Sequence, residues 1–326
     1  MLQKTQQHVS ILHISLHLCI LFFTKKEMIT KSNLSRFITS LSGILLVFFI
    51  GQTTLFSCQP TINKAEHAVE SPRTFFQQYT YSGKFLDISA ETSDARASFW
   101  KSDGTLLFIV GRQSNNVAAY IVEEPWQVHT ADFLHDTNVP GESQHGLYFR
   151  EDGKLMCIFD RTSIWSFTLA TPWDITTRSE GINHDLSHFV LRGHDIDFKP
   201  DGTILFIDDR NAGAIFEYTL STPWDLHTGN LTYTLDISDQ QKEVRGIEFL
   251  HDGTLMLIMD TERKEVLQYS LTEPYKISSA AFTSTFDVSS QTHQGRGLSF
   301  SKDETIMYVT GRDEEKVFQY EIDADN

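Results

Sequence analysis

Cysteine is scarce in this chain, which has 3 cysteines in 326 residues, at positions 19, 58 and 157. So few thiols exclude a disulfide framework, and their spacing suits no zinc site. Cys157 stands in the apolar run LMCIF, so we expect it to be a small buried hydrophobe. Apolar residues at helical spacing are also missing beyond the first 58 residues, which argues against a helical fold.

Positive charge is scarce as well. The chain carries 27 Lys and Arg against 43 Asp and Glu, a formal net charge of -16. A strongly acidic body repels nucleic acid and anionic headgroups, so no nucleic-acid partner is predicted. The sequence also lacks a Gly-x-Ser-x-Gly motif, a P-loop and a dinucleotide fingerprint. These absences leave no motif that predicts an enzyme, and no cofactor is predicted.

The N-terminal segment has the features of a targeting signal. Lys31 and Arg36 precede an apolar stretch over residues 37–50, the length of a signal-peptide hydrophobic region and short for a spanning helix. The sequence LFSC that follows resembles the lipobox of bacterial lipoproteins. That resemblance implies cleavage before Cys58 and a diacylglycerol on its sulfur, and Gln59 then favours sorting to the outer membrane. The alternative is an uncleaved membrane anchor.

The chain divides into three parts. An earlier apolar run over residues 11–23 is broken by histidines, and two tandem signals make little physical sense, so we expect translation to start at Met28. Residues 1–57 are then leader and signal, residues 58–74 a lipidated polar tether, and residues 75–326 the folded domain. This predicts a lipid-anchored protein of the bacterial cell envelope, periplasmic or surface-exposed.

A repeat of about 50 residues organises the folded domain. Asp-Gly recurs at Asp103, Asp152, Asp201 and Asp252, and Asp303-Glu304 is a degenerate fifth copy. Each copy lies between two β-type runs, which predicts a hairpin whose primed turn uses positive φ at Asp and Gly. Two further β-type runs follow in most copies. Four antiparallel strands per repeat are typical of a β-propeller blade.

The strand count predicts how the ring closes. The fifth repeat runs out of chain before its fourth strand, whereas the segment KFLDIS, residues 84–89, is a fourth strand without a blade before it. If this N-terminal strand completes blade five, no blade edge is left unpaired. The sequence therefore predicts an all-β fold, a five-bladed β-propeller of four-stranded antiparallel blades closed by an N-terminal strand.

The phrase YTLSTPWDLHTGN, which begins at Tyr218, has three relatives elsewhere in the chain. It is either a ligand site used four times or a corner between the third and fourth strands of a blade. Pro ends a strand, Trp224 can cover the neighbouring hairpin, and Asp225 can bond local amides. These features favour a structural corner.

The DGT motif and the STPWD motif, which recur in register, resemble a family of bacterial secreted β-propeller repeat proteins. The resemblance covers residues 75–322. It implies the architecture of the domain and says almost nothing about its activity, because propellers host many functions.

Basic residues recur at one position of the repeat. Seven residues before each turn Asp stand Arg96, His145, His194, Arg245 and Arg296. This basic ring begins the five inner strands, so we expect it at the channel mouth on the face away from the corners. Nine residues after the same Asp stand Arg112, Arg161, Arg210, Thr261 and Arg312, with Asp160, Asp209 and Asp260 nearby.

Two interpretations of the basic ring are open. It is a binding site for carboxylate, phosphate or sulfate, or a belt of salt bridges in which arginines pair with aspartates of neighbouring blades. The two histidines should gain charge near pH 6.5, so anion binding is expected to strengthen between about pH 7.5 and 5.5.

The sequence thus predicts a ligand-binding or interaction protein, with membrane lipid at Cys58 and an anionic small molecule, glycan or protein as partners. The alternative is a lactonase-like or glycosidase-like hydrolase that uses the same face. Its candidate carboxylates are Asp195, Asp197 and Glu248, the acidic residues of the inner strands. No metal site is predicted.

Overall fold

A computed structural model describes residues 79–188, 190 and 192–322. The predictions for the signal segment, for lipidation at Cys58 and for the tether fall outside these residues, as does the start of the 75–326 domain. In the described part of the chain, no helix is long and apolar enough to cross a membrane.

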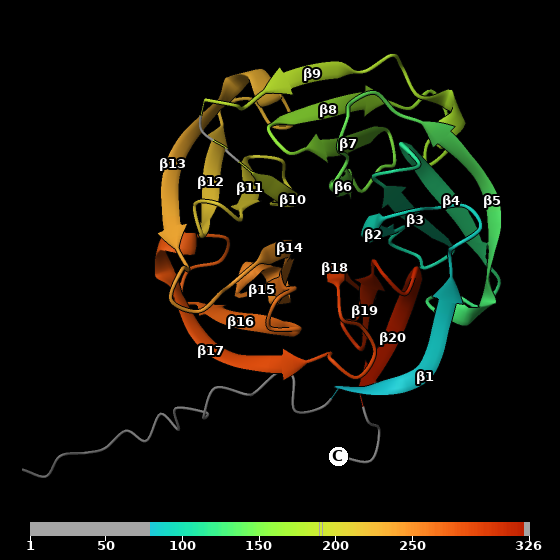
Figure 1. Cartoon of the computed structure of the whole chain (residues 1–326). Helices are drawn as coiled ribbons and strands as arrows, with labels where there is room; N and C mark the ends of the chain where they lie inside the picture. Colours follow the sequence, from blue (N-terminus) through green and yellow to red (C-terminus); the bar gives the residue numbers. More distant parts are fainter. Residues whose placement is uncertain (1–78, 189, 191, 323–326) are drawn as a thin grey trace, which may run out of the picture. The chain divides into compact units, whose positions relative to one another are not determined.

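Residues 79–322 form five four-stranded antiparallel sheets arranged as blades around one axis (Figure 1), which confirms the predicted propeller. Blade 1 consists of β2 (Ala95–Trp100), β3 (Leu106–Gly111), β4 (Asn116–Val122) and β5 (Ala131–Asn138). Blade 2 consists of β6 (Gly146–Phe149), β7 (Leu155–Asp160), β8 (Ser163–Thr168) and β9 (Ile182–Asp185). In each blade the first strand is innermost.

The other three blades repeat this plan. Blade 3 consists of β10 (Gly193–Phe198), β11 (Ile204–Asp209), β12 (Ala214–Leu220) and β13 (Gly229–Asp236). Blade 4 consists of β14 (Val244–Leu250), β15 (Leu255–Asp260), β16 (Glu265–Leu271) and β17 (Ala280–Asp287). Blade 5 consists of β18 (Gly295–Phe300), β19 (Ile306–Gly311), β20 (Lys316–Ile322) and β1 (Tyr79–Asp87).

The N-terminal strand closes the ring, as predicted. β1 runs antiparallel to β20, with Tyr79 opposite Ile322 and Phe85 opposite Phe318. Figure 1 shows the cyan β1 beside the red β20. The strand starts earlier than the predicted residue 84, because a bulge between Tyr81 and Phe85 lets the chain continue pairing on both sides of it.

The hairpin turns differ from the predicted primed type. In blades 1 to 3 only the Gly of each Asp-Gly pair has positive φ, as in Gly202 at 74°. The Asp has another role, since Asp201 Oδ1 accepts a hydrogen bond from the backbone N–H of Thr203 at 2.9 Å. In blade 5 the left-handed position belongs to Glu304, with φ of 57°.

The repeated phrase is a corner, and its aromatic ring lies on the Gly of the hairpin. Trp224 itself has a φ of 67°, and its backbone N–H donates to the carbonyl of Gly202 at 3.0 Å. A Cβ on Gly202 would lie 2.3 Å from the indole, so only glycine fits there. Asp225 accepts from the backbone N–H of His227 and thereby caps a short 3-10 helix.

The same arrangement recurs in the other three copies. The ring at the corner is Trp126, Trp173 or Tyr275, and each covers the glycine of its own hairpin, Gly104, Gly153 or Gly253. The 3-10 helices after the corners are η2 (Val128–Thr130), η3 (Ile175–Thr177), η4 (Leu226–Thr228) and η6 (Ile277–Ser279). A fifth, η5 (His251–Gly253), forms the hairpin turn of blade 4.

Aromatic packing joins neighbouring blades. Trp173 of blade 2 stacks on Phe99 and Phe108 of blade 1, with ring centroids 6.5 and 6.2 Å apart. Each apolar cluster of the core contains residues from two blades. Cys157 is 1% exposed, as predicted, and burial raises the pKa of its thiol to about 12.

Candidate functional site

The basic ring forms at one end of the inner strands. Arg96, His194, Arg245 and Arg296 lie in β2, β10, β14 and β18, and His145 directly precedes β6. Each of the five is at most 7% exposed. Inner strands of adjacent blades nearly touch, because a Cβ on Gly297 would lie 2.8 Å from the Cα of Ala97. The narrow centre therefore forces the five side chains together.

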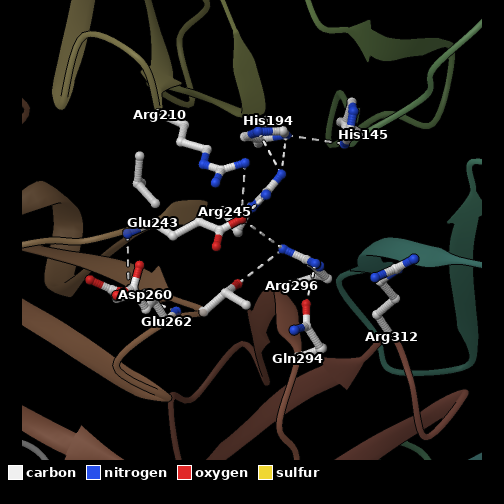
Figure 2. A network of polar contacts seen from close by, with 12 residues as sticks. His145, His194, Arg210, Glu243, Arg245, Asp260, Glu262, Gln294, Arg296 and Arg312 are labelled. Carbon is white, nitrogen blue, oxygen red and sulfur yellow. Dashed lines mark hydrogen bonds and ion pairs between the residues drawn. The ribbon is translucent and has the colours of Figure 1, made fainter.

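Ring members contact one another directly (Figure 2). Arg245 Nη1 lies 2.6 Å from His194 Nε2, and the Nδ1 atoms of His194 and His145 are 3.2 Å apart. On its other side His145 Nε2 accepts from Arg161 Nε at 3.3 Å. Because a guanidinium only donates hydrogen bonds, His145 Nε2 must accept from Arg161, which a doubly protonated ring cannot do. Arg245 Nη1 lies 2.6 and 3.0 Å from the two ring nitrogens of His194, so a positive charge on that ring would be repelled.

Both histidines are therefore neutral near physiological pH, and the prediction that they gain charge near pH 6.5 is wrong. Burial first, and then the neighbouring cations, hold the pKa of His145 and His194 far below the usual 6.5. For His145 the largest cationic contribution comes from Arg96. The charge of the basic ring consequently resides on its arginines.

One carboxylate, Glu243, holds three arginines. It precedes β14, is 16% exposed, and contacts the guanidinium of Arg245 directly. Its Oε1 also lies 3.2 Å from Arg210 Nη1 and 3.7 Å from Arg296 Nη1. These arginines come from blades 3, 4 and 5 (Figure 2), so Glu243 joins three blades through a single carboxyl group.

A second carboxylate, Asp94, serves the other side of the ring. It lies 2.7 Å from Arg96 and 2.5 Å from both Arg112 and Arg312. Burial alone would raise the pKa of Asp94, but Arg96 and the two other guanidiniums outweigh it and lower the pKa. Asp94 is thus a permanent anion at neutral pH.

Six arginines contact these two carboxylates, and Arg312 also pairs with Asp313 at 3.4 Å, so among the described residues guanidiniums outnumber their paired carboxylates at this mouth six to three. Burial lowers the pKa of Arg96, Arg245 and Arg296 to about 9, 8 and 10, so all three remain cationic at pH 7. The Nε atom of each has no hydrogen-bond partner among residues 79–188, 190 and 192–322. Arg112, Arg210 and Arg312 are 27–30% exposed and form the outer rim.

The carboxylates that pair with the arginines are not the three aspartates that the sequence predicted. Asp160, Asp209 and Asp260 accept backbone N–H groups of loops in their own blades. Asp260, for example, accepts from Glu243 at 3.2 Å and from Glu262 at 3.0 Å. They organise the loops that carry the basic residues and do not pair with the ring. Asp94 and Glu243, which sequence spacing did not indicate, are the actual partners.

A cavity of about 320 Å³ lies at the opposite end of the inner strands, on the corner face. Three of the corner rings, Trp126, Trp173 and Tyr275, line it, and so do Asp195, Asp197 and Glu248. These carboxyl groups, predicted for a hydrolase on the basic face, therefore belong to the other end. A feature of the sequence could have indicated that Asp197 and Glu248 lie at equivalent positions, because each stands four residues before a turn Asp.

The three carboxyl groups differ in their bonding. Asp195 and Asp197 reach across to the next inner strand and accept from the backbone N–H groups of Ile247 at 3.2 Å and Phe249 at 3.0 Å. Glu248 makes no hydrogen bond to any described residue. Burial raises the pKa of Asp197 to about 7. Burial, and then Asp197 and Asp195, raise the pKa of Glu248 well above its usual range.

Two histidines four residues apart in the chain, His184 and His188, do not form a ligand pair. His184 packs on His227 with ring centroids 4.4 Å apart, while His188 is exposed. Within the part of the chain that the structure describes, no group of three His, Cys, Asp or Glu side chains is placed to hold a metal ion.

No protein-family model and no curated protein matches this chain. Among solved structures it is similar to a functionally unknown protein from Desulfotomaculum acetoxidans, with 11% identity, a TM-score of 0.42, and coverage of 67% of this chain and 63% of that one. It is also similar to a Pseudomonas aeruginosa periplasmic gluconolactonase, with 16% identity, a TM-score of 0.42, and coverage of 67% and 65%. The chain thus spans less than two thirds of either protein. Likenesses this distant carry no argument about activity.

Proposed function

We propose that this protein is a binding protein whose basic mouth takes a small anionic ligand. The observation that carries the proposal is the excess of positive charge at the mouth, where six arginines, three of them buried, surround Asp94 and Glu243. Like charges gathered away from water cost free energy unless an opposite charge offsets them. An anion at the mouth supplies the missing negative charge.

The geometry favours a compact ligand with carboxylate, phosphate or sulfate groups. A guanidinium donates two parallel hydrogen bonds to such groups. Arg210 and Arg312 come from the rims of blades 3 and 5 and are reachable from solvent, whereas Arg96, Arg245 and Arg296 are buried behind them. An incoming anion would meet the rim first and then compete with Glu243 for Arg210.

A thermal-shift screen tests the proposal. Phosphate, sulfate, citrate and acidic sugars are added at pH 7 and low salt, and a bound anion raises the melting temperature by mass action. The test variant is Arg210→Ala with Arg312→Ala, because both side chains are partly exposed and their loss should leave the fold intact. Arg263→Ala, an arginine beside Asp260, is the matched control. Equal shifts in wild type and test variant would refute the proposal.

We further propose that the domain is held at the bacterial envelope by lipid on Cys58, outside the cytoplasm and with the outer membrane favoured. The support is the signal-like segment and the LFSC sequence. In cells fed labelled palmitate, wild type should be labelled and fractionate with membranes, and Cys58→Ser should lose both properties. A labelled Cys58→Ser protein would contradict the anchor.

Hydrolysis is the second candidate function, and its candidate carboxyl groups lie on a different face from the one predicted. Asp195, Asp197 and Glu248 would have to act from the corner-face cavity, at the other end of the inner strands from the basic ring. The raised pKa of Asp197, about 7, suits a general acid near neutral pH. Screening lactones and aryl glycosides on wild type and on Asp197→Asn tests this candidate, and absence of turnover in wild type would dismiss it.

A further inference from the structure

We propose that the corner-face cavity is a second binding site, and that its ligand is an organic ammonium ion. The site lies at the end of the inner strands away from the basic mouth and shares none of the basic-ring residues. It joins an aromatic wall to a carboxyl group without a partner. That combination fits a positively charged group that carries apolar substituents.

The wall of the cavity is aromatic on several sides. Trp126, Trp173 and Tyr275 come from the corners of blades 1, 2 and 4, and Tyr148 and Phe249 come from inner strands. A volume of about 320 Å³ is within the range of small-molecule sites. Aromatic faces attract a cation within about 6 Å of the ring centroid. Lining rings from three different corners bring several aromatic groups within reach of a ligand in the cavity.

The acidic groups are fixed within the cavity. Asp195 and Asp197 are each held by two backbone N–H groups, one from their own strand and one from β14. They cannot swing away without breaking these bonds. Glu248, by contrast, makes no hydrogen bond or ion pair with a described residue. Its oxygen atoms are the free acceptors of the site.

No cation inside the cavity balances this charge. Among the lining residues Lys302 is the one with a positive charge, and it stands on the rim, 67% exposed and 3.5 Å from Glu151. Glu248 is influenced by Asp197 and Asp195 of β10 and by Glu304 of the β18–β19 turn, all of them acidic. Near it also lie the phenols of Tyr148 and Tyr275, whose pKa is raised by burial first. An ammonium ion would supply the absent counter-charge.

The proposal has a characteristic pH dependence. An unbalanced carboxyl group in this cavity holds its proton to a higher pH than usual, as the raised pKa values of Asp197 and Glu248 indicate. A cation binds to the ionised form and must expel that proton. Affinity for an ammonium ligand should therefore rise with pH, and the pKa of about 7 at Asp197 places part of that rise between about pH 5.5 and 8. The proposed anion site should not show such a rise, because its arginines gain no positive charge as the pH increases, and Arg245, with a pKa of about 8, begins to lose its charge at the upper end of the range.

Isothermal titration with choline tests the proposal, and 3,3-dimethylbutan-1-ol, which has the same shape without the charge, is the matched ligand. Glucose is titrated as a neutral polyol. We expect choline to bind wild type at pH 8, the neutral analogue to bind at least tenfold more weakly, and choline affinity to fall at pH 5.5. Glu248→Gln, which keeps the shape and removes the charge, should lower choline affinity at least tenfold. Glu273→Gln, an exposed acid outside the cavity, should leave it unchanged.

Three results would overturn the proposal. One is no choline binding to wild type at pH 8. A second is equal binding of choline and its neutral analogue, which would make the cavity merely apolar. The third is binding of glucose without choline, which would make it a site for neutral sugars. Melting curves of both variants, expected to match or exceed that of wild type, separate loss of the site from loss of the fold.

Discussion

Arg245 Nη1 lies 2.6 Å from His194 Nε2, and both side chains are more than nine tenths buried. The cationic guanidinium lies against both ring nitrogens of the imidazole, and burial and this neighbouring charge lower the pKa of His194, so His194 is held neutral. This contact changes the interpretation of the basic ring, the five residues seven positions before each turn Asp. They look like five equivalent cations in the sequence, but the structure makes them three cations and two neutral imidazoles.

The first prediction concerns acid stability. The pKa of His145 and His194 is lower in the folded protein than the unfolded value of about 6.5. Below pH 6.5 the unfolded chain therefore binds protons that the folded protein does not, and stability is lost as the pH falls. At about 1.4 kcal/mol per pH unit for each group, the two histidines should cost about 2–4 kcal/mol between pH 7 and 5.

Urea unfolding at pH 7 and pH 5 measures this loss as a difference between wild type and a variant, because the raised pKa values of Asp197 and Asp208 change stability in the opposite direction over the same interval. The variant with His145→Gln and His194→Gln keeps acceptor oxygens but cannot titrate, so it should lose about 2–4 kcal/mol less stability than wild type over that interval. If wild type and variant lose the same amount, the histidines are not held neutral.

The second prediction compares two glycines with left-handed backbone. Gly83 has φ of 81° and open space where a Cβ would lie, whereas Gly202, with φ of 74°, faces the Trp224 indole at 2.3 Å. Alanine at residue 83 should cost about 1–2 kcal/mol, from backbone strain alone. Alanine at residue 202 should cost at least about 1–3 kcal/mol more, because the ring must move. Equal losses in thermal melts would contradict the corner packing.

The third prediction concerns closure of the ring. Removing residues 1–87 deletes β1 and exposes the edge of β20, which now pairs from Tyr79 to Asp87. Loss of a complete outer strand should lower the free energy of unfolding by several kcal/mol and promote association through the open edge. A truncation that starts at residue 79 is the control. If both forms melt alike and stay monomeric by light scattering, closure contributes nothing.

The spacing of Asp-Gly pairs predicted the blades, because hairpins must recur at the blade period, and the count of strands in the last repeat predicted the closing strand. The fixed distance from the turn Asp also predicted the basic ring, because a residue seven positions before that Asp lies at the start of an inner strand. The spacing could not predict partners. Asp94 pairs with arginines of blades 1 and 5, whereas Asp260 accepts backbone N–H groups of the loops beside it. The direction of each side chain depends on the local loop backbone, which differs between repeats and cannot be predicted from their spacing.

The cavity and the neutral histidines were missed for a related reason. Trp126, Trp173 and Tyr275 do serve as corners, so the structural interpretation of the phrase was correct, yet their rings also line a cavity. The charge state of His194 depends on burial and on Arg245, which lies 51 residues away in the chain. Neither effect is visible in composition or period.

The proposed anion site is tested most directly by calorimetric titration of the best anion from the thermal-shift screen. For an anion whose own charge is constant in this range, such as sulfate, the histidines should contribute no strengthening of binding between pH 7 and 5.5, because the arginines carry the charge and the histidines do not titrate there. Affinity should fall as salt is raised from about 20 to 200 mM, since the rim arginines are screened. Arg210→Ala with Arg312→Ala should weaken binding at least tenfold, while Arg263→Ala should not. If no anion binds wild type, or if it binds the double variant equally well, the basic mouth is a structural belt and the account is wrong.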